Sequence, residues 1–307
     1  MIEIYMPSSP SSAECRSNLT RSKTQIMSSK SVKLRRLLSL PILSVFVLVG
    51  FIYYITIFVF LEDWLGLHSS SGSLNTLIFS VLASFTLFSF LVCATTDPGR
   101  VPSGYVPDIE HSDASDQESK KNDVQLRRCD KCSAFKPPRA HHCRVCKRCV
   151  LRMDHHCLWI NNCVGHQNYK AYVILVLYAT VTNIYSSVII VCSAILKDWA
   201  FNGSSSIKIF YICSAIMTMG FSFTLGTLLG WHIYLITRNK TTIEYYESVR
   251  AEWLARKSGQ SYHHPFDVGF YKNITLILGP NMLKWLFPTA VSHLKDGIQF
   301  PTVRDSL

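Results

Sequence analysis

Four long runs without a charged residue interrupt an otherwise polar sequence. They cover residues 37–61, 74–94, 171–196 and 209–236, and each is 21 to 28 residues long. About 20 residues of α-helix cross a hydrocarbon core of about 30 Å, whereas buried helices of soluble proteins rarely reach that length without a polar face. The pattern therefore predicts an α-helical, polytopic membrane protein with four transmembrane helices.

Composition fits a chain that mixes very apolar segments with strongly polar ones. Charged residues make up 17% and hydrophobic residues 48% of the 307 positions, and the mean hydropathy is +0.18. Soluble domains carry about 25% charged residues, and a chain that is disordered throughout has far fewer apolar residues. The numbers therefore exclude an ordinary soluble domain and a wholly disordered protein.

Basic residues gather in three of the five segments outside the predicted spans. Lys and Arg number seven in residues 1–36, thirteen in 95–170 and nine in 237–307, against none in 62–73 and two in 197–208. Loops rich in Lys and Arg remain in the cytosol. We therefore expect both termini and the large middle loop to be cytosolic.

The patterning predicts six segments. Residues 1–36 are basic and Ser-rich and residues 106–123 acidic and polar, so both are expected to be disordered. Two isolated signals are Cys15, a candidate for acylation by position alone, and Asn202, which opens a glycosylation sequon. The expected organisation is 1–36, N-terminal arm; 37–94, two spans; 95–126, linker; 127–170, cysteine-rich domain; 171–236, two spans; 237–307, cytosolic tail.

Seven of the eleven cysteines lie in one short segment that also holds four histidines. These residues are Cys129, Cys132, Cys143, Cys146, Cys149, Cys157 and Cys163, with His141, His142, His155 and His156. Cys-x2-Cys pairs with nearby histidines are typical of tetrahedral zinc sites, and disulfides are rare in the cytosol. Two structural zinc ions need eight ligands, so six Cys and two His would leave one Cys and two His free.

A free thiol beside a free imidazole is how a cysteine nucleophile is built, because the imidazole favours the thiolate and a carboxylate orients the imidazole. The run from Asp154 to Cys157 supplies all three groups in four positions. Spacing alone leaves open which cysteine is free. It also leaves open a fully structural cluster with one bystander cysteine.

The sequence motif of this segment has many fixed positions. It contains Cys129-x2-Cys132, Lys136-Pro137-Pro138-Arg139, His142-Cys143-x2-Cys146, Cys149 and Asp154-His155-His156-Cys157-x-Trp159-Ile160-x-Asn162-Cys163-x-Gly165. It resembles the cysteine-rich domain of the DHHC protein S-acyltransferases, also called palmitoyltransferases. Asp97-Pro98-Gly99, Thr241-Thr242-Ile243-Glu244 and a tail from Pro265 to Asn273 and Gly279 resemble the other motifs of that family. The resemblance extends over about residues 37–288, and the wording is closest to plant members.

This resemblance implies a complete set of site residues. One zinc would be held by Cys129, Cys132, His142 and Cys149, and a second by Cys143, Cys146, His156 and Cys163. Cys157 would be the nucleophile, supported by His155 and Asp154. Thr242 would bond near Asp154, Asn273 would organise the tail, and Trp159 would be a further supporting residue.

The resemblance also implies the reaction and its partners. The chain would transfer a long-chain acyl group, chiefly palmitoyl, from palmitoyl-CoA to cysteines of substrate proteins at the cytosolic face of the bilayer. Two structural zinc ions would be its metals, and no nucleic acid is expected. We expect an endomembrane location, in the Golgi or endoplasmic reticulum, with the plasma membrane as the alternative.

The position of the segment suits this chemistry. Only seven residues separate Cys163 from the third span, which would hold the nucleophile where an apolar acyl tail and an anionic CoA meet. The domain is rich in basic residues suited to CoA phosphates or to anionic lipid: Arg127, Arg128, Arg139, Arg144, Lys147, Arg148 and Arg152.

Two other classes of protein are compatible with part of the pattern. A membrane-tethered zinc module would not need an Asp-His-His-Cys run with a spare thiol, and a transporter would need charged residues in its spans. Asn183 is expected to bond between helices rather than to line an acyl cavity. His232, His263 and His264 are expected to be packing or interfacial residues rather than ligands. The apolar side chains of Met282, Leu283, Trp285, Leu286 and Phe287 are expected to lie at the membrane interface or under the catalytic domain.

Overall fold

The computed structural model describes residues 37–107, 127–196 and 205–306. The expected N-terminal arm with Cys15, most of the acidic linker and the sequon at Asn202 lie outside these residues. Within them, the elements in chain order are α2 (Leu40–Tyr54), the π-helical η1 (Ile55–Leu61), α3 (Glu62–Leu65), α4 (Ser70–Thr95), β1 (Arg128–Cys129), β2 (Ala134–Phe135), β3 (His141–Cys143), β4 (Arg148–Val150), β5 (His155–Cys157), β6 (Asn162–Val164), α6 (Tyr169–Leu196), α7 (Ser205–Thr237), α8 (Thr242–Lys257), α9 (Phe270–Leu278), η2 (Met282–Lys284) and η3 (Val303–Ser306).

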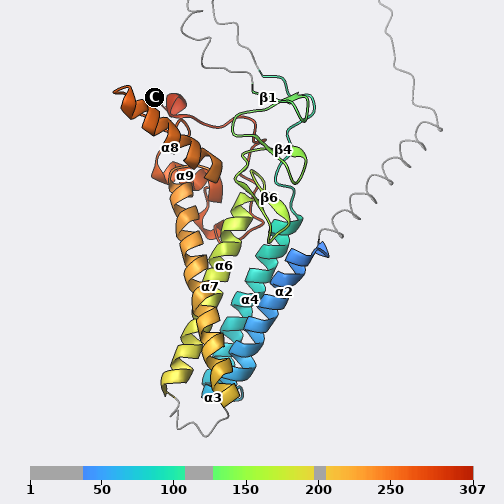
Figure 1. Cartoon of the computed structure of the whole chain (residues 1–307), viewed down its shortest axis with the longest axis vertical. Coiled ribbons are helices and arrows are strands. Elements are labelled where there is room, and N and C mark those ends of the chain that lie inside the picture. The colour runs from blue at the N-terminus through green and yellow to red at the C-terminus, as the bar shows by residue number, and fades with distance from the viewer. Residues whose placement is uncertain (1–36, 108–126, 197–204, 307) are drawn as a thin grey trace, which may run out of the picture.

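Four helices are long and apolar enough to cross a membrane, as the sequence predicts (Figure 1). They cover Leu40–Leu65, Ser70–Thr95, Tyr169–Leu196 and Lys208–Thr237. The first extends past the uncharged run through Glu62 and Asp63, because a helix ends where its backbone finds a cap and not where charge begins. The chain is a multi-pass membrane protein, and the predicted fold is confirmed.

α6 packs between α4 and α7 in the bundle. Hydroxyl pairs join the helices inside it: Thr86 Oγ1 lies 3.0 Å from Thr182 Oγ1, and Thr56 Oγ1 lies 2.7 Å from Ser186 Oγ. Polar pairs of this kind hold transmembrane helices together, since lipid offers them no partner. Asn183 instead donates to the carbonyl oxygen of Ala179 in its own helix.

The cysteine-rich segment folds into three antiparallel hairpins, β1–β2, β3–β4 and β5–β6. The turn of each hairpin contains one residue with positive φ, at Ser133, Lys147 and Asn161. In Figure 1 the hairpins follow one another along the long axis, with β1 farthest from the four long helices of the bundle and β6 beside the start of α6. The third hairpin is therefore the one nearest to the membrane helices.

Two glycines let the segment after α4 lie against the hairpins. Gly99 has φ +104°, and its carbonyl oxygen accepts from the Leu151 amide at 3.1 Å. A Cβ on Gly165 would lie within 3 Å of Val150 and of the carbonyl oxygens of Leu151 and Pro98. The Asp-Pro-Gly motif thus fixes the end of α4 to the second and third hairpins.

The tail packs back on the hairpins and the bundle. α8 begins with a capping box, in which Thr241 Oγ1 accepts from the Glu244 amide and Glu244 Oε2 accepts from the Thr241 amide. Lys170, at the start of α6, donates to carbonyl oxygens of Leu278, Lys284 and Ala290 at 2.7 to 2.9 Å. The start of the third span and the tail are therefore one packed unit.

Candidate active site

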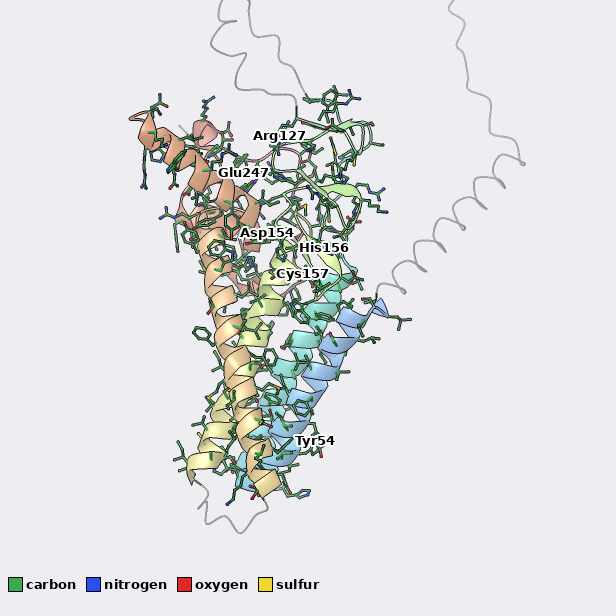
Figure 2. The ribbon with its side chains drawn as sticks, in the orientation of Figure 1. Tyr54, Arg127, Asp154, His156, Cys157 and Glu247 are labelled. Atoms are coloured by element: carbon green, nitrogen blue, oxygen red, sulfur yellow. The ribbon has the colours of Figure 1, made fainter. Side chains whose placement is uncertain are left out.

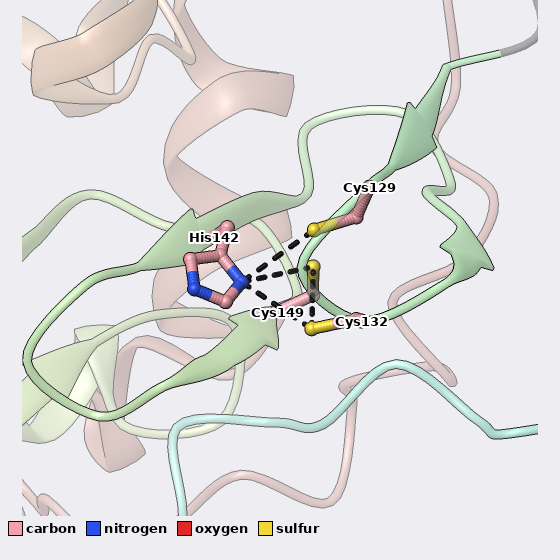
Figure 3. A group of neighbouring side chains, drawn as sticks. All are labelled: Cys129, Cys132, His142 and Cys149. Atoms are coloured by element: carbon pink, nitrogen blue, oxygen red, sulfur yellow. Dashed lines mark hydrogen bonds between the residues drawn. The ribbon is translucent and has the colours of Figure 1, made fainter.

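The first group of metal-ligating side chains joins the first hairpin to the second (Figure 3). His142 Nδ1 lies 3.5 Å from Cys129 Sγ, 3.3 Å from Cys132 Sγ and 3.9 Å from Cys149 Sγ, and Cys149 Sγ lies 3.8 Å from Cys132 Sγ. The Cys-x2-Cys pair comes from β1 and its turn, and the other two groups come from β3 and β4. All four face a common centre.

The second group repeats this arrangement one hairpin later. His156 Nδ1 lies 3.7, 3.5 and 3.6 Å from the Sγ atoms of Cys143, Cys146 and Cys163. Cys163 Sγ lies 3.4 Å from Cys146 Sγ. The second and third hairpins are thus joined in the same way as the first and second.

Both groups have the geometry of a tetrahedral zinc site. Ligands at Zn–S of about 2.3 Å and Zn–N of about 2.0–2.1 Å stand about 3.5–3.8 Å from one another, and the measured separations run from 3.3 to 3.9 Å. In each group the four candidate atoms lie within 4.8 Å of one another. Three thiols and one imidazole suit zinc, so the residues present fit two such ions.

Cys157 belongs to neither group, although its two neighbours in the third hairpin, His156 and Cys163, do. Figure 2 shows it below Asp154 and beside His156, just above the helices. The thiol is buried, with 8% of the residue exposed, in a cluster that includes Phe90 of α4 and Tyr172 of α6. The cysteine that carries no ligand role is therefore the one placed where the hairpins meet the spans.

His155 connects Cys157 to a buried carboxylate. Its Nδ1 lies 2.7 Å from Asp154 Oδ2, and its side chain is hydrogen-bonded to the Cys157 thiol. Asp154 also accepts from the Thr242 amide and from Thr242 Oγ1, both at 2.9 Å. The carboxylate is thereby fixed on both sides, and it holds the imidazole toward the thiol.

Charges in this trio favour the ionised thiol. Burial raises the pKa of Cys157, but the hydrogen bond from His155 and the amides of Ile160 and Trp159 outweigh it and bring the pKa below its ordinary value. Burial alone would lower the pKa of His155, but Asp154 and Cys157 raise it to about 9. Burial likewise opposes ionisation of Asp154, whose pKa is nevertheless lowered by His155 and the Thr242 amide. Both shifts act in the direction of a thiolate beside an imidazolium.

The turn after Cys157 contributes two backbone donors to this thiol. Amides of the same two positions also face the first cysteine of the other hairpins, at Cys129 and Cys143. One of these contacts is 3.3 Å, from the Cys146 amide to Cys143 Sγ. The hairpin turn is thus a backbone site for a sulfur anion, whether or not that sulfur faces a second thiol.

A buried ion pair missed by the sequence analysis locks the hairpins to α8. Arg139 donates from Nε and from a terminal nitrogen to the two carboxylate oxygens of Glu244, at 2.7 and 2.8 Å, with both side chains buried. It also donates to the Asn239 carbonyl oxygen at 2.7 Å. Burial raises the pKa of Glu244, but Arg139 holds it at about 2. The Glu of the Thr-Thr-x-Glu motif is the signal that could have shown this pair.

Two asparagines fix the third hairpin to the membrane-spanning helices. Asn162 donates to carbonyl oxygens at the end of α4, including that of Thr96 at 2.9 Å. Asn168 donates to the Cys163 carbonyl oxygen and accepts from the Gly165 amide, both at 2.9 Å. The third hairpin is therefore fixed to α4 and to the start of α6.

Two further residues implied by the resemblance are Asn273, in the tail, and Trp159, in the turn after Cys157. Asn273 is fully buried, donates to the Thr237 carbonyl oxygen and to Asp267, and accepts from the Val268 amide. It therefore closes the loop before α9 against the end of α7. Trp159 is 59% exposed beside Cys157.

Two of the seven basic residues expected to suit CoA phosphates or anionic lipid do not lie on the surface. Arg139 and Arg152 are only 3% and 4% exposed, because Glu244 and the ring of Tyr169 draw them inward. His232 packs as expected, and its Nδ1 also lies 3.1 Å from Tyr169 Oη. The side chain of Arg148 forms an ion pair with Asp97 at 2.7 Å.

Comparisons with known proteins agree with this site. Residues 122–249 match the model of the DHHC palmitoyltransferases. "Probable protein S-acyltransferase 15" of Arabidopsis thaliana is 60% identical over 257 residues, 84% of this chain and 100% of the relative. "Probable protein S-acyltransferase 16" of the same plant is 51% identical over 271 residues, 88% of this chain and 94% of the relative. Human "Palmitoyltransferase ZDHHC2" is 36% identical over 182 residues, 58% of this chain and 46% of the relative. Because the two Arabidopsis relatives are 51–60% identical over 84–88% of this chain, the chain belongs to the DHHC palmitoyltransferase family.

Proposed function

We propose that this membrane-embedded protein S-acyltransferase works through an acyl-enzyme thioester on Cys157, with His155 moving the proton and Asp154 orienting His155. The observation that carries the proposal is the unligated, buried thiol hydrogen-bonded to an imidazole that a fixed carboxylate holds. Parts of the sequence are also compatible with a zinc-binding module or a transporter, and acyl transfer replaces both of these interpretations. Acyl-CoA is the donor of the family, and palmitoyl-CoA is the donor proposed here.

The two Cys and His groups are proposed to hold structural zinc ions. When bound, each ion would cross-link two hairpins and leave no open coordination position for water, since four protein ligands fill it. His156 and Cys163 both flank Cys157 in the third hairpin. Their fixed positions would therefore keep the nucleophile in place against the spans.

In the first step Cys157 attacks as the thiolate. Its sulfur forms a bond to the thioester carbonyl carbon, the bond from that carbon to the CoA sulfur breaks, and His155 gives its proton to the departing CoA thiolate. Asp154 stabilises the imidazolium before transfer and keeps Nδ1 facing away from the thiol. The backbone amides of the hairpin turn stabilise the attacking sulfur.

In the second step the acyl group passes to a substrate protein. His155, now neutral, takes the proton from a substrate cysteine, whose sulfur attacks the acyl carbonyl carbon. The Cys157–acyl bond breaks, and Cys157 leaves as the thiolate beside the imidazolium. The enzyme is then back in its starting protonation state.

Placement of the thiol supports a donor that lies partly in the bilayer. Cys157 packs against residues of α4 and α6, so an acyl tail can lie among the helices while CoA stays outside them. Each buried CH₂ contributes about 0.8 kcal/mol, which makes a long chain the favoured donor. We further propose cytosolic termini, substrate cysteines at the cytosolic membrane face, and an endomembrane location in the Golgi or endoplasmic reticulum.

The test uses the full chain and a clickable palmitate analogue. Cys157→Ser is expected to abolish hydroxylamine-sensitive labelling while zinc stays at two per chain. Cys93→Ser is the matched control, because Cys93 is a second buried cysteine in the same cluster as Cys157. Labelling that persists in Cys157→Ser, or that disappears equally in Cys93→Ser, would contradict the assignment.

A further inference from the structure

A cavity lies on the side of the hairpins that faces the tail. Its volume is about 520 Å³, which is within the usual range for small-molecule sites. The segments that flank the second and third hairpins, the start of α6, α9 and the C-terminal segment all contribute to its walls. Neither Cys157 nor His155 is among its lining residues. The cavity is therefore separate from the reacting thiol.

Its most unusual lining residue is Arg152, a buried cation without a carboxylate partner. The residue is 4% exposed, and its φ of +41° puts the backbone in the left-handed region. Its guanidinium stacks over Tyr169 at 4.8 Å, and it donates a long hydrogen bond, 3.4 Å, to Asn239 Oδ1. Among the residues described by the structure, no carboxylate lies within 4.0 Å of it.

The neighbouring ion pair does not neutralise Arg152. Arg139 also lines the cavity, and it donates to both carboxylate oxygens of Glu244, so that pair carries no net charge. Glu244 and Asp154 attract Arg152 only from beyond ion-pair distance, so Arg152 is a buried cation without a direct carboxylate contact. Burial and the charge of Arg139 lower its pKa to about 10, so it remains protonated at neutral pH. A buried charge of this kind is costly unless an anion accompanies it.

Other groups at the cavity fit an anion that also carries hydroxyls. Lys295 is exposed and adds a second cation to the lining, and the exposed Asp296 and Asp305 add carboxylates, of which one oxygen each already accepts from Ile298 or Thr302. Carboxylates repel a phosphate but accept hydrogen bonds from hydroxyls. A buried guanidinium together with exposed acceptors suits a molecule with a phosphate at one end and hydroxyls at the other.

We propose that this cavity binds a phosphorylated polyol, such as an inositol phosphate or the headgroup of a phosphoinositide. The phosphate would lie on Arg152 and Lys295, and the ring hydroxyls would donate to Asp296 and Asp305. The start of α6 contributes Tyr169 and Lys170 to the wall, so the site lies at the end of a span and either a soluble molecule or a lipid headgroup can reach it. This binding is separate from acyl transfer at Cys157.

The experiment measures binding to the purified full chain in two arms. The soluble arm titrates inositol 1,4,5-trisphosphate by calorimetry. The lipid arm compares nanodiscs that contain phosphatidylinositol 4-phosphate with nanodiscs of equal charge made with phosphatidylserine. We expect saturable binding in at least one arm, and the arm that responds identifies the source of the phosphate.

Variants decide whether that binding takes place in the cavity. Arg152→Gln and Lys295→Gln are each expected to weaken it about ten-fold or more, because each removes a charge-assisted contact to phosphate. Leu294→Trp should weaken it by filling the cavity without a change of charge. Lys284→Gln is the matched control, since it removes the same charge from a residue of the same tail that does not line the cavity, and it should bind normally.

Three results would overturn the proposal. They are absence of binding in both arms at millimolar probe, equal affinity of the wild type and all three cavity variants, and displacement of the probe by unacylated CoA, which would make the cavity part of the donor site. Should Arg152→Gln fail to fold, Lys295→Gln and Leu294→Trp decide alone. Labelling of Cys157 is scored separately, so failure of the cavity and failure of the acyl-enzyme can be told apart.

Discussion

The second and third hairpins share one design and differ in chemistry. Equivalent positions are fourteen residues apart: Cys143 and Cys157 begin the turns, His142 and His156 precede them, and Cys149 and Cys163 lie in the returning strands. Six positions differ between residues 140–150 and 154–164, and two of these differences bear directly on the cysteine and on the first histidine. The second cysteine of the turn, Cys146, is replaced by Ile160, and the residue before the two histidines, Ala140, is replaced by Asp154.

Each replacement has a separate effect. Ile160 leaves Cys157 without a second thiol, although the amides of the turn still favour its ionised form. Asp154 changes the first histidine of the pair: burial and Arg127 lower the pKa of His141 to about 4, whereas Asp154 and Cys157 overcome burial and raise that of His155 to about 9. These two side chains account for the different roles proposed for the two cysteines, zinc binding for Cys143 and nucleophilic attack for Cys157.

Order along the chain completes the contrast. Each Cys-x2-Cys turn shares its centre with a His and a Cys from the following hairpin. In the described part of the chain, the third hairpin is followed by α6 and not by another hairpin. Cys157 therefore has no later strands to supply the rest of a metal site, and it faces the membrane helices instead.

The largest effect is expected from removing the equivalent sulfur in the second hairpin. Cys143→Ser takes away a metal ligand, and structural zinc sites contribute about 10–16 kcal/mol to folding, so the domain should lose metal and its cooperative unfolding. Cys157→Ser, fourteen residues later, should keep both. Metal analysis and thermal unfolding of the two variants check this, and two zinc ions per chain in Cys143→Ser would break the comparison.

The second-largest effect is expected from removing Asp154, the carboxylate that the second hairpin lacks. Asp154→Ala copies Ala140 and removes the partner that orients His155, so acyl-enzyme formation should slow by about 10³–10⁴-fold with zinc content unchanged. Thr242→Val keeps the carboxylate but loses one of its two hydrogen bonds from Thr242, and should slow the reaction less. Single-turnover labelling gives both rates. A rate for Asp154→Ala within ten-fold of wild type would show that Asp154 is structural.

A smaller effect, on stability, is expected where α8 holds the hairpins. Glu244→Gln leaves Arg139 buried without its carboxylate and should cost about 3–5 kcal/mol. The folded pKa of Glu244, about 2, lies below the unfolded value of about 4.3, so its contribution is complete above that value and is lost as pH falls toward 2. Denaturant unfolding at several pH values should therefore show a constant difference between wild type and variant from pH 8 to 5, which narrows below. An equal difference at all pH values would exclude the ion pair as its source.

The smallest effect is expected at Trp159, in the turn itself. Its backbone amide faces the thiol, but its side chain is 59% exposed, so Trp159→Ala should change the free energy of unfolding by no more than about 0.5 kcal/mol. Ile160, 1% exposed, is the control next to it, and Ile160→Ala should cost about 2–4 kcal/mol. Equal losses for the two would mean that the exposed ring is buried in solution.

Local patterns predicted the spans and the metal groups because each of those signals lies within a short stretch. An uncharged run needs no partner to be apolar, and Cys-x2-Cys brings two ligands together in one turn. The pairing of Arg139 with Glu244, 105 residues apart, has no such local sign, and neither has the burial of Arg152. From the sequence alone, a basic residue in a basic segment is predicted to be exposed to solvent. The carboxylate, ring or carbonyl oxygens that allow it to be buried become its neighbours only in the folded chain.

Lys170 shows how the order of synthesis bears on the enzyme. The carbonyl oxygens that receive its ammonium lie 108, 114 and 120 residues later in the chain, a stretch that a ribosome adds in about 6–24 s at about 5–20 residues per second. During that interval the hairpins and the third span exist without the tail that packs against the start of α6. The contacts that fix the start of α6 beside the proposed active site therefore form only when translation is nearly over, and a product that ends before residue 278 would contain the proposed catalytic residues without the carbonyl oxygens that bind Lys170.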